Sequence, residues 1–213
     1  MEENYTAPKP KVNKTLKSVF DFFEPVIFAL IAVVVIFLFF ARLTIVSGSS
    51  MDNTLHNGNF VIVSDFMLTY EPKQGDIVVI KGDFGENANN IEYDTPIVKR
   101  VIATENQAVR IEFYDNYCDV FVDDEQYKIP NETYTYSFVK YENALIGNKN
   151  YHVIGDRKYY ETIVDDGCVF VMGDNRAVSV DSRSIRIQLV DKKDIIGKVQ
   201  CVLYPFDRIS YVY

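Results

Sequence analysis

The feature that most constrains this chain is a run of apolar residues near its N-terminus. Residues 25–41, PVIFALIAVVVIFLFFA, are 17 residues without a polar side chain. As a helix they would be about 25 Å long, close to the ~30 Å hydrocarbon core of a bilayer. Apolar side chains would cover every side of that helix, whereas a core helix of a globular domain has a single apolar stripe. We therefore predict a transmembrane anchor over residues 20–42.

A cleaved signal peptide is the alternative for this segment, because a basic leader precedes the apolar run. The run is long for that role, and the LTIV stretch after Arg42 is not a small-residue cleavage site. Four lysines precede the segment, and after Arg42 the next basic residue is Lys73. Since basic residues stay on the cytoplasmic side, we predict a single-pass cell-membrane protein with a cytoplasmic tail over residues 1–19 and an extracellular domain.

The remainder of the chain carries mainly strand signals. Short apolar runs alternate with turn residues, and the only helical periodicity after residue 43 is a weak signal around residues 137–147. We predict an all-β domain whose core comprises residues 43–111 and 163–213. Residues 112–162, which are richer in Tyr, Asn, Asp and Glu, are predicted to form an inserted second lobe. The expected strands lie at 59–63, 76–80, 95–103, 108–113, 118–124, 168–174 and 194–204.

Composition excludes several classes of function. The net charge of −8 argues against a nucleic-acid partner, which would need a basic patch. No HExxH or similar ligand spacing indicates a metal site, so neither a metal nor another cofactor is predicted. The cysteines are too few and too far apart for a disulfide framework or a zinc site, although one disulfide with a free thiol stays open. They are Cys118, Cys168 and Cys201.

Small hydroxyl residues follow the apolar segment in the stretch SGSSMDNTL, residues 47–55. A serine hydroxyl is a poor nucleophile without a base. The chain has two histidines, His56 in a turn and His152 in the polar insertion, and both fit ordinary surface positions. No Ser-x-x-Lys arrangement follows these serines. Lysine is therefore the remaining type of base.

Lys99 differs from the other lysines because it lies in the apolar stretch PIVKRVIA. Burial beside apolar neighbours lowers the pKa of a lysine, and the neutral amine can then accept a proton from a serine. Taken alone, Lys99 would also fit a lysine at the edge of a strand that points into water.

Four stretches occur in a fixed order after the apolar segment: SGSSMDNTL, GDIVVI, KRVIA and GDNRAVSVDSR. Together they resemble the bacterial type I signal peptidases (peptidase family S26), membrane-bound Ser/Lys endopeptidases that remove signal peptides from exported proteins. The resemblance covers the anchor and roughly residues 43–110 and 163–200, but not the insertion. It implies a signal-peptidase-like β fold with an all-β catalytic domain, signal peptides of exported precursors and membrane lipid as partners, and no cofactor.

The resemblance also implies the catalytic residues. The nucleophile is the serine just before the methionine, hence Ser50 before Met51, and the general base is the lysine before the arginine, Lys99. The oxyanion hole uses the backbone N–H of Ser50. Some members add a serine side chain two residues earlier, where this chain has Gly48, which resembles the Gram-positive branch, as does the single anchor.

Further residues are assigned by the same resemblance. Ser179 matches a serine that orients the base lysine through a hydrogen bond. Asp181 and Arg183 match a buried ion pair that braces the site, with Arg100 as a further candidate member. The turn that presents this strand is expected to contain Asp174, Asn175 and Arg176.

In the family, the end of the signal peptide binds as an added strand, here between about residues 44–46 and 95–98. Shallow apolar pockets accept small side chains at the first and third positions before the cut. Ser50 lies nine residues past Ala41, at most ~30 Å in an extended chain, so the site can lie at the outer membrane surface. The candidate wall residues are Val46, Met51, Leu55 and Val98.

The chain departs from the family pattern at three places. Asn53 stands where the family usually has a proline. Residues 103–107 stand where the family has a stretch that contains glycine and proline. Residues 184–190 stand in place of a second family motif and are about two residues longer than it. These departures suggest a divergent member with a specialised substrate or low activity.

Two other functions are compatible with the same fold. One is a non-catalytic, membrane-anchored assembly factor for a pilus or surface protein, against which the presence of both Ser50 and Lys99 argues. The other is a self-cleaving Ser/Lys regulator, which the absence of a DNA-binding helix pair and the N-terminal anchor oppose.

Overall fold

The computed structural model describes residues 14–39, 41–52, 54–64, 70–82, 95–115, 117–128, 145 and 147–212. Its chain divides into two compact units, Met1–Phe40 and Ala41–Tyr213. The first contains helix α1 (Lys14–Phe39). Its window Ser18–Val35 has a mean hydropathy of 2.2, is long and apolar enough to cross a membrane, and has no buried residue.

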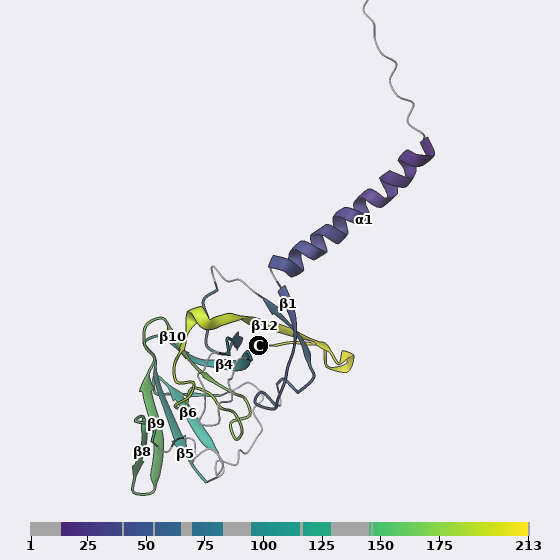
Figure 1. The fold of residues 1–213 in the computed structure, drawn as a ribbon. Coiled ribbons are helices and arrows are strands. Elements are labelled where there is room, and N and C mark those ends of the chain that lie inside the picture. The colour runs from purple at the N-terminus through teal and green to yellow at the C-terminus, as the bar shows by residue number, and fades with distance from the viewer. Residues whose placement is uncertain are drawn as a thin grey trace, which may run out of the picture. The chain divides into compact units, whose positions relative to one another are not determined.

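An eight-stranded antiparallel sheet dominates the second unit (Figure 1). Its strand order is β1-β2-β12-β3-β4-β10-β11, and β13 pairs with β12. The long strand β12, near the C-terminus, thus lies between β2 and β3, which joins the early and late parts of the domain in one sheet. The strands are β1 (Ala41–Ile45), β2 (Phe60–Ser64), β3 (Ile77–Ile80), β4 (Ile97–Thr104), β10 (Cys168–Met172), β11 (Val190–Asp191), β12 (Ile195–Tyr204) and β13 (Ser210–Tyr211).

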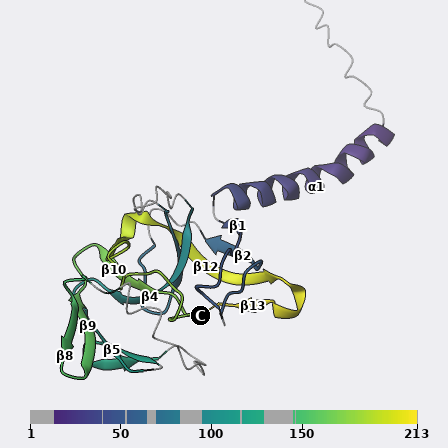
Figure 2. The same cartoon turned by 60° about the horizontal axis from the view of Figure 1, so that its bottom comes forward.

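A second, five-stranded sheet has the order β7-β6-β5-β9-β8. In Figure 2, β5, β8 and β9 lie together at the lower left, apart from β1, β2 and β13. This sheet extends from residue 108 to residue 163, so it begins four residues before the predicted second lobe. Its strands are β5 (Ala108–Phe113), β6 (Cys118–Val122), β7 (Glu125–Tyr127), β8 (Tyr151–Ile154) and β9 (Arg157–Ile163).

Three apolar clusters give this unit its core, and two of them bear on the arrangement of the site. One joins the sheets, because residues of β4 and β10 such as Ile102 and Phe170 pack with Ile111 and Tyr160 of the second sheet. The other packs the loop after β1 onto the large sheet and includes Val46, Met51, Leu55, Val61, Val63, Ile77, Val79, Val199, Val202 and Val212. The second cluster therefore ties the serine-containing loop to the sheet.

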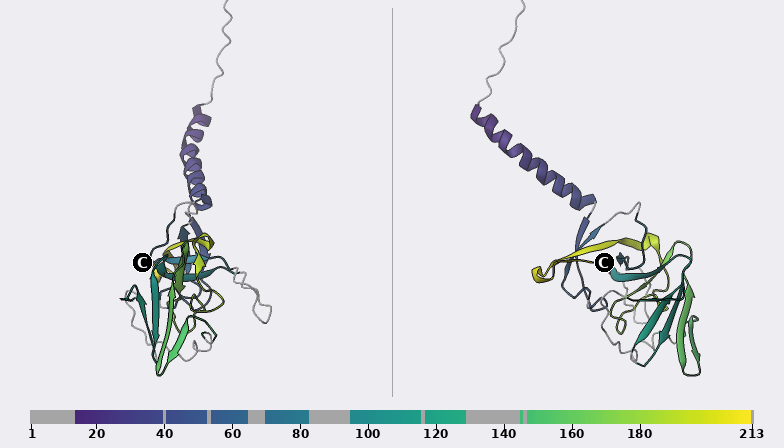
Figure 3. Two further views of the ribbon diagram at one scale, coloured as in Figure 1. Left: turned by 90° about the vertical axis from the view of Figure 1, so that its left-hand side faces the viewer. Right: turned by 180° about the vertical axis from the view of Figure 1, so that it is seen from behind.

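All seven predicted strands are confirmed, and they form β2, β3, β4, β5, β6, β10 and β12. Strand β1 was missed, since residues 41 and 42 were assigned to the anchor. They pair with β2 in the register Ala41↔Ser64 and Arg42↔Val63. The short or polar strands β7, β8, β9, β11 and β13 also lack the apolar runs used for prediction. The hairpin that ends in β13 projects from the sheet in the right-hand view of Figure 3.

The three cysteines are free thiols, which answers the question that their spacing left open.

Candidate active site

The loop that follows β1 holds Ser50 at the edge of the large sheet. Gly48 has a φ of +94°, a left-handed conformation that glycine adopts without strain. Its N–H donates to Asn57 Oδ1 at 3.0 Å. Beyond the serine, the side chains of Met51 and Leu55 are 1% and 0% exposed. The loop is therefore anchored on both sides of Ser50, which itself is half-buried.

Lys99 reaches this loop from β4, where it lies opposite Val78 of β3. Its side chain is 3% exposed. The Nζ atom lies 2.9 Å from Ser50 Oγ and donates to the carbonyl oxygen of Val98 at 3.0 Å. The apolar sequence around Lys99 left both burial and an exposed strand edge open. The structure buries the side chain and places the amine within hydrogen-bonding distance of the Ser50 hydroxyl.

Burial lowers the pKa of Lys99 from 10.5 to about 8. The nearby carboxylates of Asp181 and Asp174 oppose this shift, whereas the positive charge of Arg183 adds to it. Loss of hydration is the largest cause because an ammonium ion loses its water in a buried site. An amine with this pKa is neutral in a substantial fraction of molecules at mildly alkaline pH and can accept a proton.

The turn after β10 holds the serine loop from the other side. The N–H of Asn175 donates to the carbonyl oxygen of Ser50 at 3.0 Å, and its Nδ2 donates to that of Ser49 at 3.0 Å. Asp174 accepts two hydrogen bonds from the guanidinium of Arg100, at 2.8 and 2.7 Å, with both side chains buried. The expected turn thus contacts the serine loop directly, and Arg100, a candidate member of the Asp181–Arg183 pair, forms its ion pair with Asp174 instead.

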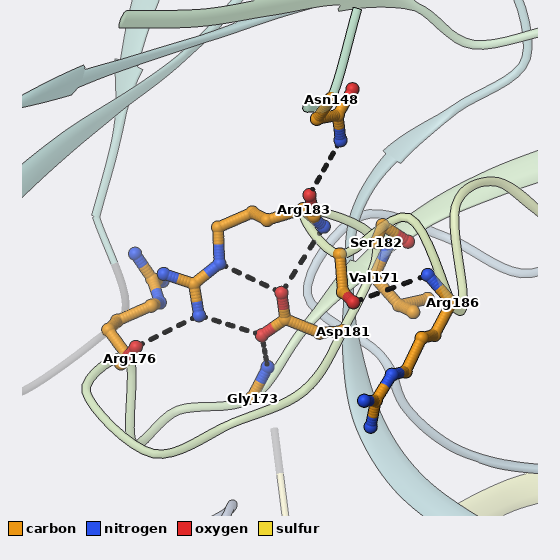
Figure 4. Close-up of polar contacts among 9 residues, drawn as sticks. Asn148, Val171, Gly173, Arg176, Asp181, Ser182, Arg183 and Arg186 are labelled. Atoms are coloured by element: carbon orange, nitrogen blue, oxygen red, sulfur yellow. Dashed lines mark hydrogen bonds and ion pairs between the residues drawn. The ribbon is translucent and has the colours of Figure 1, made fainter. Parts of the chain in front are cut away.

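A second buried ion pair joins Asp181 and Arg183 (Figure 4). The guanidinium donates to both carboxylate oxygens, at 2.8 and 2.9 Å, and also to the carbonyl oxygen of Arg176 at 2.9 Å. The N–H of Gly173 donates to the same carboxylate at 3.0 Å. Burial alone would raise the pKa of Asp181, but the Arg183 charge holds it below its ordinary value. The pair links the turn to the strand that precedes it.

Ser179 does not form the hydrogen bond expected of it. The residue is fully buried, but among the described residues its Oγ has no hydrogen-bond partner. Lys99 Nζ is instead directed to Ser50 and to the carbonyl of Val98. The Ser179 hydroxyl packs over Gly173, where an added Cβ would lie 2.2 Å from it.

Gly173 was not predicted from the sequence, yet it contacts both sides of the site. A Cβ at this position would lie 2.4 Å from the carbonyl oxygen of Ser50. We expect Gly173→Ala to displace Ser50 and to lower kcat/KM for peptide cleavage by about 10²-fold, the usual consequence of a ~1 Å misplacement. Steady-state kinetics of the full-length protein measure this.

Gly147→Ala is the matched control. Its φ of +87° makes any side chain strained, but nothing lies within 4 Å of the added Cβ. We expect it to lower the unfolding midpoint while leaving kcat/KM near the parent value. Equal losses of activity in both variants would show that Gly173 acts through stability alone.

A cavity of about 270 Å³ opens beside Ser50. None of the four candidate wall residues lines it. Met51 and Leu55 are buried, Val46 is 5% exposed, and Val98 packs against the same apolar cluster. They were proposed because they are apolar and lie close to Ser50 in sequence or, for Val98, directly before Lys99. The side chains of Val46, Met51 and Leu55 fill the core, and that of Val98 is partly buried against it. The described lining residues are Ser47, Gly48, Ser49, Ser50, Ile97, Lys99, Val178, Val180, Arg186 and Ile187.

Backbone N–H groups of the serine loop are the candidate donors of a hydrogen bond to an oxyanion. The N–H of Ser50 donates no hydrogen bond to any described residue and is available to an oxyanion, whereas that of Gly48 is bonded to Asn57.

The two histidines contact other residues than Ser50. His56 contacts Asp52 at 3.3 Å, and His152 packs on Tyr159.

The other departures from the family pattern fall in different places. Asn53 lies outside the described residues. Residues 103–107 form the end of β4 and the turn to β5, in which Thr104 donates to the Gln107 side chain. Residues 184–190 follow the buried ion pair and contribute Arg186 and Ile187 to the cavity.

Comparison with known proteins identifies the family of the chain. Residues 19–204 match the family "Signal peptidase, peptidase S26". The chain is 33% identical to Signal peptidase I of Bacillus licheniformis over 193 residues, covering 90% of this chain and 92% of the relative. It is 32% identical to Signal peptidase I P of Bacillus subtilis subsp. natto over 202 residues, covering 94% and 97%. A crystal structure of a signal peptidase I from Enterococcus faecalis is 21% identical, with a TM-score of 0.37, and covers 61% of this chain and 97% of that one.

Proposed function

Because the chain belongs to the signal peptidase family, peptidase S26, and is a serine peptidase, we propose that it cleaves signal peptides from exported precursors with Ser50 as nucleophile and Lys99 as general base. The observation that carries this assignment is the 2.9 Å distance between Lys99 Nζ and Ser50 Oγ at a buried lysine. A hydroxyl beside a neutral amine is the arrangement that an activated serine requires.

The proposed reaction begins with neutral Lys99. Its Nζ takes the proton from Ser50 Oγ as that oxygen attacks the carbonyl carbon of the scissile bond. The resulting oxyanion accepts a hydrogen bond from the Ser50 N–H, for which a typical contribution is ~10²–10³ in rate. Protonated Lys99 then gives its proton to the leaving amine. Water attacks the ester with Lys99 again as base, which releases the signal peptide and restores the serine.

The surrounding contacts support this assignment by limiting the motion of both groups. Asn175 holds the carbonyl oxygens of Ser49 and Ser50, and the pairing of β4 with β3 holds Lys99. Asp174 and Asp181 are each paired with an arginine, so neither carboxylate faces Lys99 without compensation. A positioned pair needs less reorganisation in the transition state than a mobile one.

We infer that helix α1 anchors the enzyme in the cell membrane, with its lysine-rich N-terminal side in the cytoplasm and residues 41–213 outside. The apolar window without buried residues supports the anchor. The active-site loop follows the helix by only a few residues beyond β1, which suits substrates that themselves emerge from the bilayer.

The test is cleavage of an exported precursor by the full-length protein in detergent with added lipid. N-terminal sequencing of the product should place the cut after a small-x-small sequence. If several precursors stay intact under conditions in which the protein is folded, the proposed peptidase function fails and a non-catalytic assembly factor is favoured.

Activity should depend on pH through Lys99. Below a pH of about 8 the buried amine is protonated and cannot accept a proton, and above it the amine is neutral. We therefore expect kcat/KM to rise about tenfold per pH unit below pH 8 and to level off above it. Initial rates between acidic and alkaline pH measure the profile, and a rate that is constant across this range would rule out Lys99 as the base.

A further inference from the structure

The serine loop continues beyond Ser50 as a helical turn that ends at Leu55. The N–H groups of Thr54 and Leu55 both donate to the carbonyl oxygen of Met51, at 3.1 and 2.8 Å. In such a turn, residues four positions apart lie on the same face. Met51 and Leu55 form one such pair, which is buried in the core. Ser50 and Thr54 form the neighbouring pair, so both side chains leave the turn on the same side.

The side chain of Thr54 connects this turn to the turn after β10. Its Oγ1 donates to Asp174 Oδ2 at 2.5 Å, a short bond of the kind that a hydroxyl makes to a carboxylate. Asp174 is 1% exposed and accepts two further hydrogen bonds from Arg100. The acceptor is therefore a fixed point to which Thr54 ties the serine loop.

This bond complements the two hydrogen bonds that Asn175 makes to the loop. Asn175 holds the carbonyl oxygens of Ser49 and Ser50, at the start of the turn. Thr54 holds the turn four residues further on, and among the described residues of the loop it is the only one whose side chain bonds to the turn after β10. Two separate attachments limit rotation of the turn about its axis, which would swing Ser50 Oγ away from Lys99 Nζ.

The core packing of Met51 and Leu55 does not replace this attachment. Apolar burial is not directional, whereas a hydrogen bond weakens steeply when its angle departs from the preferred one. Packing therefore sets how closely the turn approaches the sheet, and the bond of Thr54 sets which way its polar face points.

We propose that Thr54 is a positioning residue that keeps the Ser50 hydroxyl aligned with the Lys99 amine through its hydrogen bond to Asp174. The inference rests on the proposed function, in which a proton passes from Ser50 Oγ to Lys99 Nζ. Proton transfer needs these atoms within hydrogen-bonding distance, and a misplacement of about 1 Å can lower a rate by about 10²-fold.

The experiment removes the hydroxyl of Thr54 and keeps the shape of the side chain. We measure single-turnover cleavage of an exported precursor by the full-length protein in lipid-containing detergent, over a range of enzyme concentrations. Thr54→Val should lower the rate constant at saturating enzyme by about tenfold or more, with half-saturation within about twofold of the parent. Thr54→Ser keeps the donor and should lose no more than about threefold, through freer rotation of its side chain.

The pH profile separates alignment from a change in the base. In Thr54→Val the amine of Lys99 keeps its burial and its charged neighbours, namely Asp174, Asp181 and Arg183. The midpoint of the profile should therefore stay near the parent's, while the plateau at alkaline pH falls. A midpoint that moves to higher pH with an unchanged plateau would mean that Thr54 acts through the charge of Asp174, which overturns the alignment role.

A matched control makes the same substitution elsewhere. Thr162 lies on β9, and its Oγ1 donates to the carbonyl oxygen of Ile163 outside the active site. Thr162→Val should keep the parent's rate constant and pH profile. Circular dichroism at the assay temperature establishes that each variant is folded. Should Thr54→Val not fold, Thr54→Ala takes its place, because it removes the donor without placing a methyl group against the Asp174 carboxylate.

The outcomes distinguish this inference from the proposed function. Cleavage at the parent's rate by folded Thr54→Val overturns the role of Thr54 and leaves the peptidase function standing. Equal losses in Thr54→Val and Thr54→Ser also overturn it, because the hydroxyl then makes no difference. Absence of cleavage by the parent overturns the proposed function and this inference with it.

Discussion

Ser50→Ala should lower kcat for precursor cleavage by at least about 10⁴-fold, because it removes the only atom proposed to attack the scissile carbonyl. The fold should persist, since the substitution deletes one half-buried hydroxyl and leaves the backbone contacts of residue 50 unchanged. The measurement is cleavage of a precursor by the purified full-length variant, with circular dichroism to monitor folding.

Ser47→Ala provides the neighbouring control for Ser50. Ser47 lies in the same loop and is exposed, but it has no recorded contact with Lys99. Its substitution should leave kcat close to that of the parent. Substantial cleavage by Ser50→Ala together with loss of activity in Ser47→Ala would move the nucleophile to another serine of the loop.

Lys99→Arg should be inactive, with a loss of about 10³-fold or more in kcat. Arginine has a similar length and charge, but its guanidinium stays protonated and cannot accept the serine proton. The pocket also has no place for the larger planar group, because Lys99 is 3% exposed and its Nζ already contacts Ser50 Oγ and the Val98 carbonyl. Single-turnover cleavage across the alkaline range would detect any residual activity.

Lys149→Arg tests whether a lysine-to-arginine change harms the enzyme in general. Lys149 is exposed and lies outside the active site, so the variant should match the parent. Retention of activity in Lys99→Arg, with the same pH dependence as the parent, would exclude Lys99 as the base and require a different group to activate Ser50.

The two arginine–carboxylate pairs limit how far the nearby carboxylates raise the pKa of Lys99. Each buried carboxylate is compensated by a guanidinium, Asp174 by Arg100 and Asp181 by Arg183. An uncompensated carboxylate near Lys99 would raise its pKa and keep it protonated. The pairs therefore help to keep the amine neutral for its proposed role as base, beyond bracing the backbone.

The sequence by itself determined the apolar helix and nominated the two central residues of the site. An unbroken apolar run indicates a helix exposed to lipid through its composition alone. The apolar stretch around Lys99 was compatible with burial and a lowered pKa, but taken alone it also fitted a lysine at a strand edge, and the family resemblance decided between the two. The choice of Ser50 among three nearby serines depended on family resemblance, because all three have similar local surroundings in the sequence.

Strand β1 shows where local composition was insufficient. Residues 41 and 42 were assigned to the anchor, and Leu43 and Ile45, which follow them in β1, are apolar and yet 51% and 56% exposed. Apolar residues suit a membrane and a sheet edge equally well, and only the pairing with β2 distinguishes them. The position of the first strand, and hence of the serine loop, required the tertiary structure.

The surroundings of the site were decided by tertiary structure alone. Gly173, the contacts of Asn175 with the serine loop, and Arg186 in the cavity wall come from segments more than a hundred residues after Ser50. The candidate wall residues near Ser50 in sequence proved to be core. Residue type predicts whether a side chain is buried, but which segments meet depends on the strand order, in which β4 lies between β3 and β10. That order is a property of the whole sheet and has no local signature in the sequence.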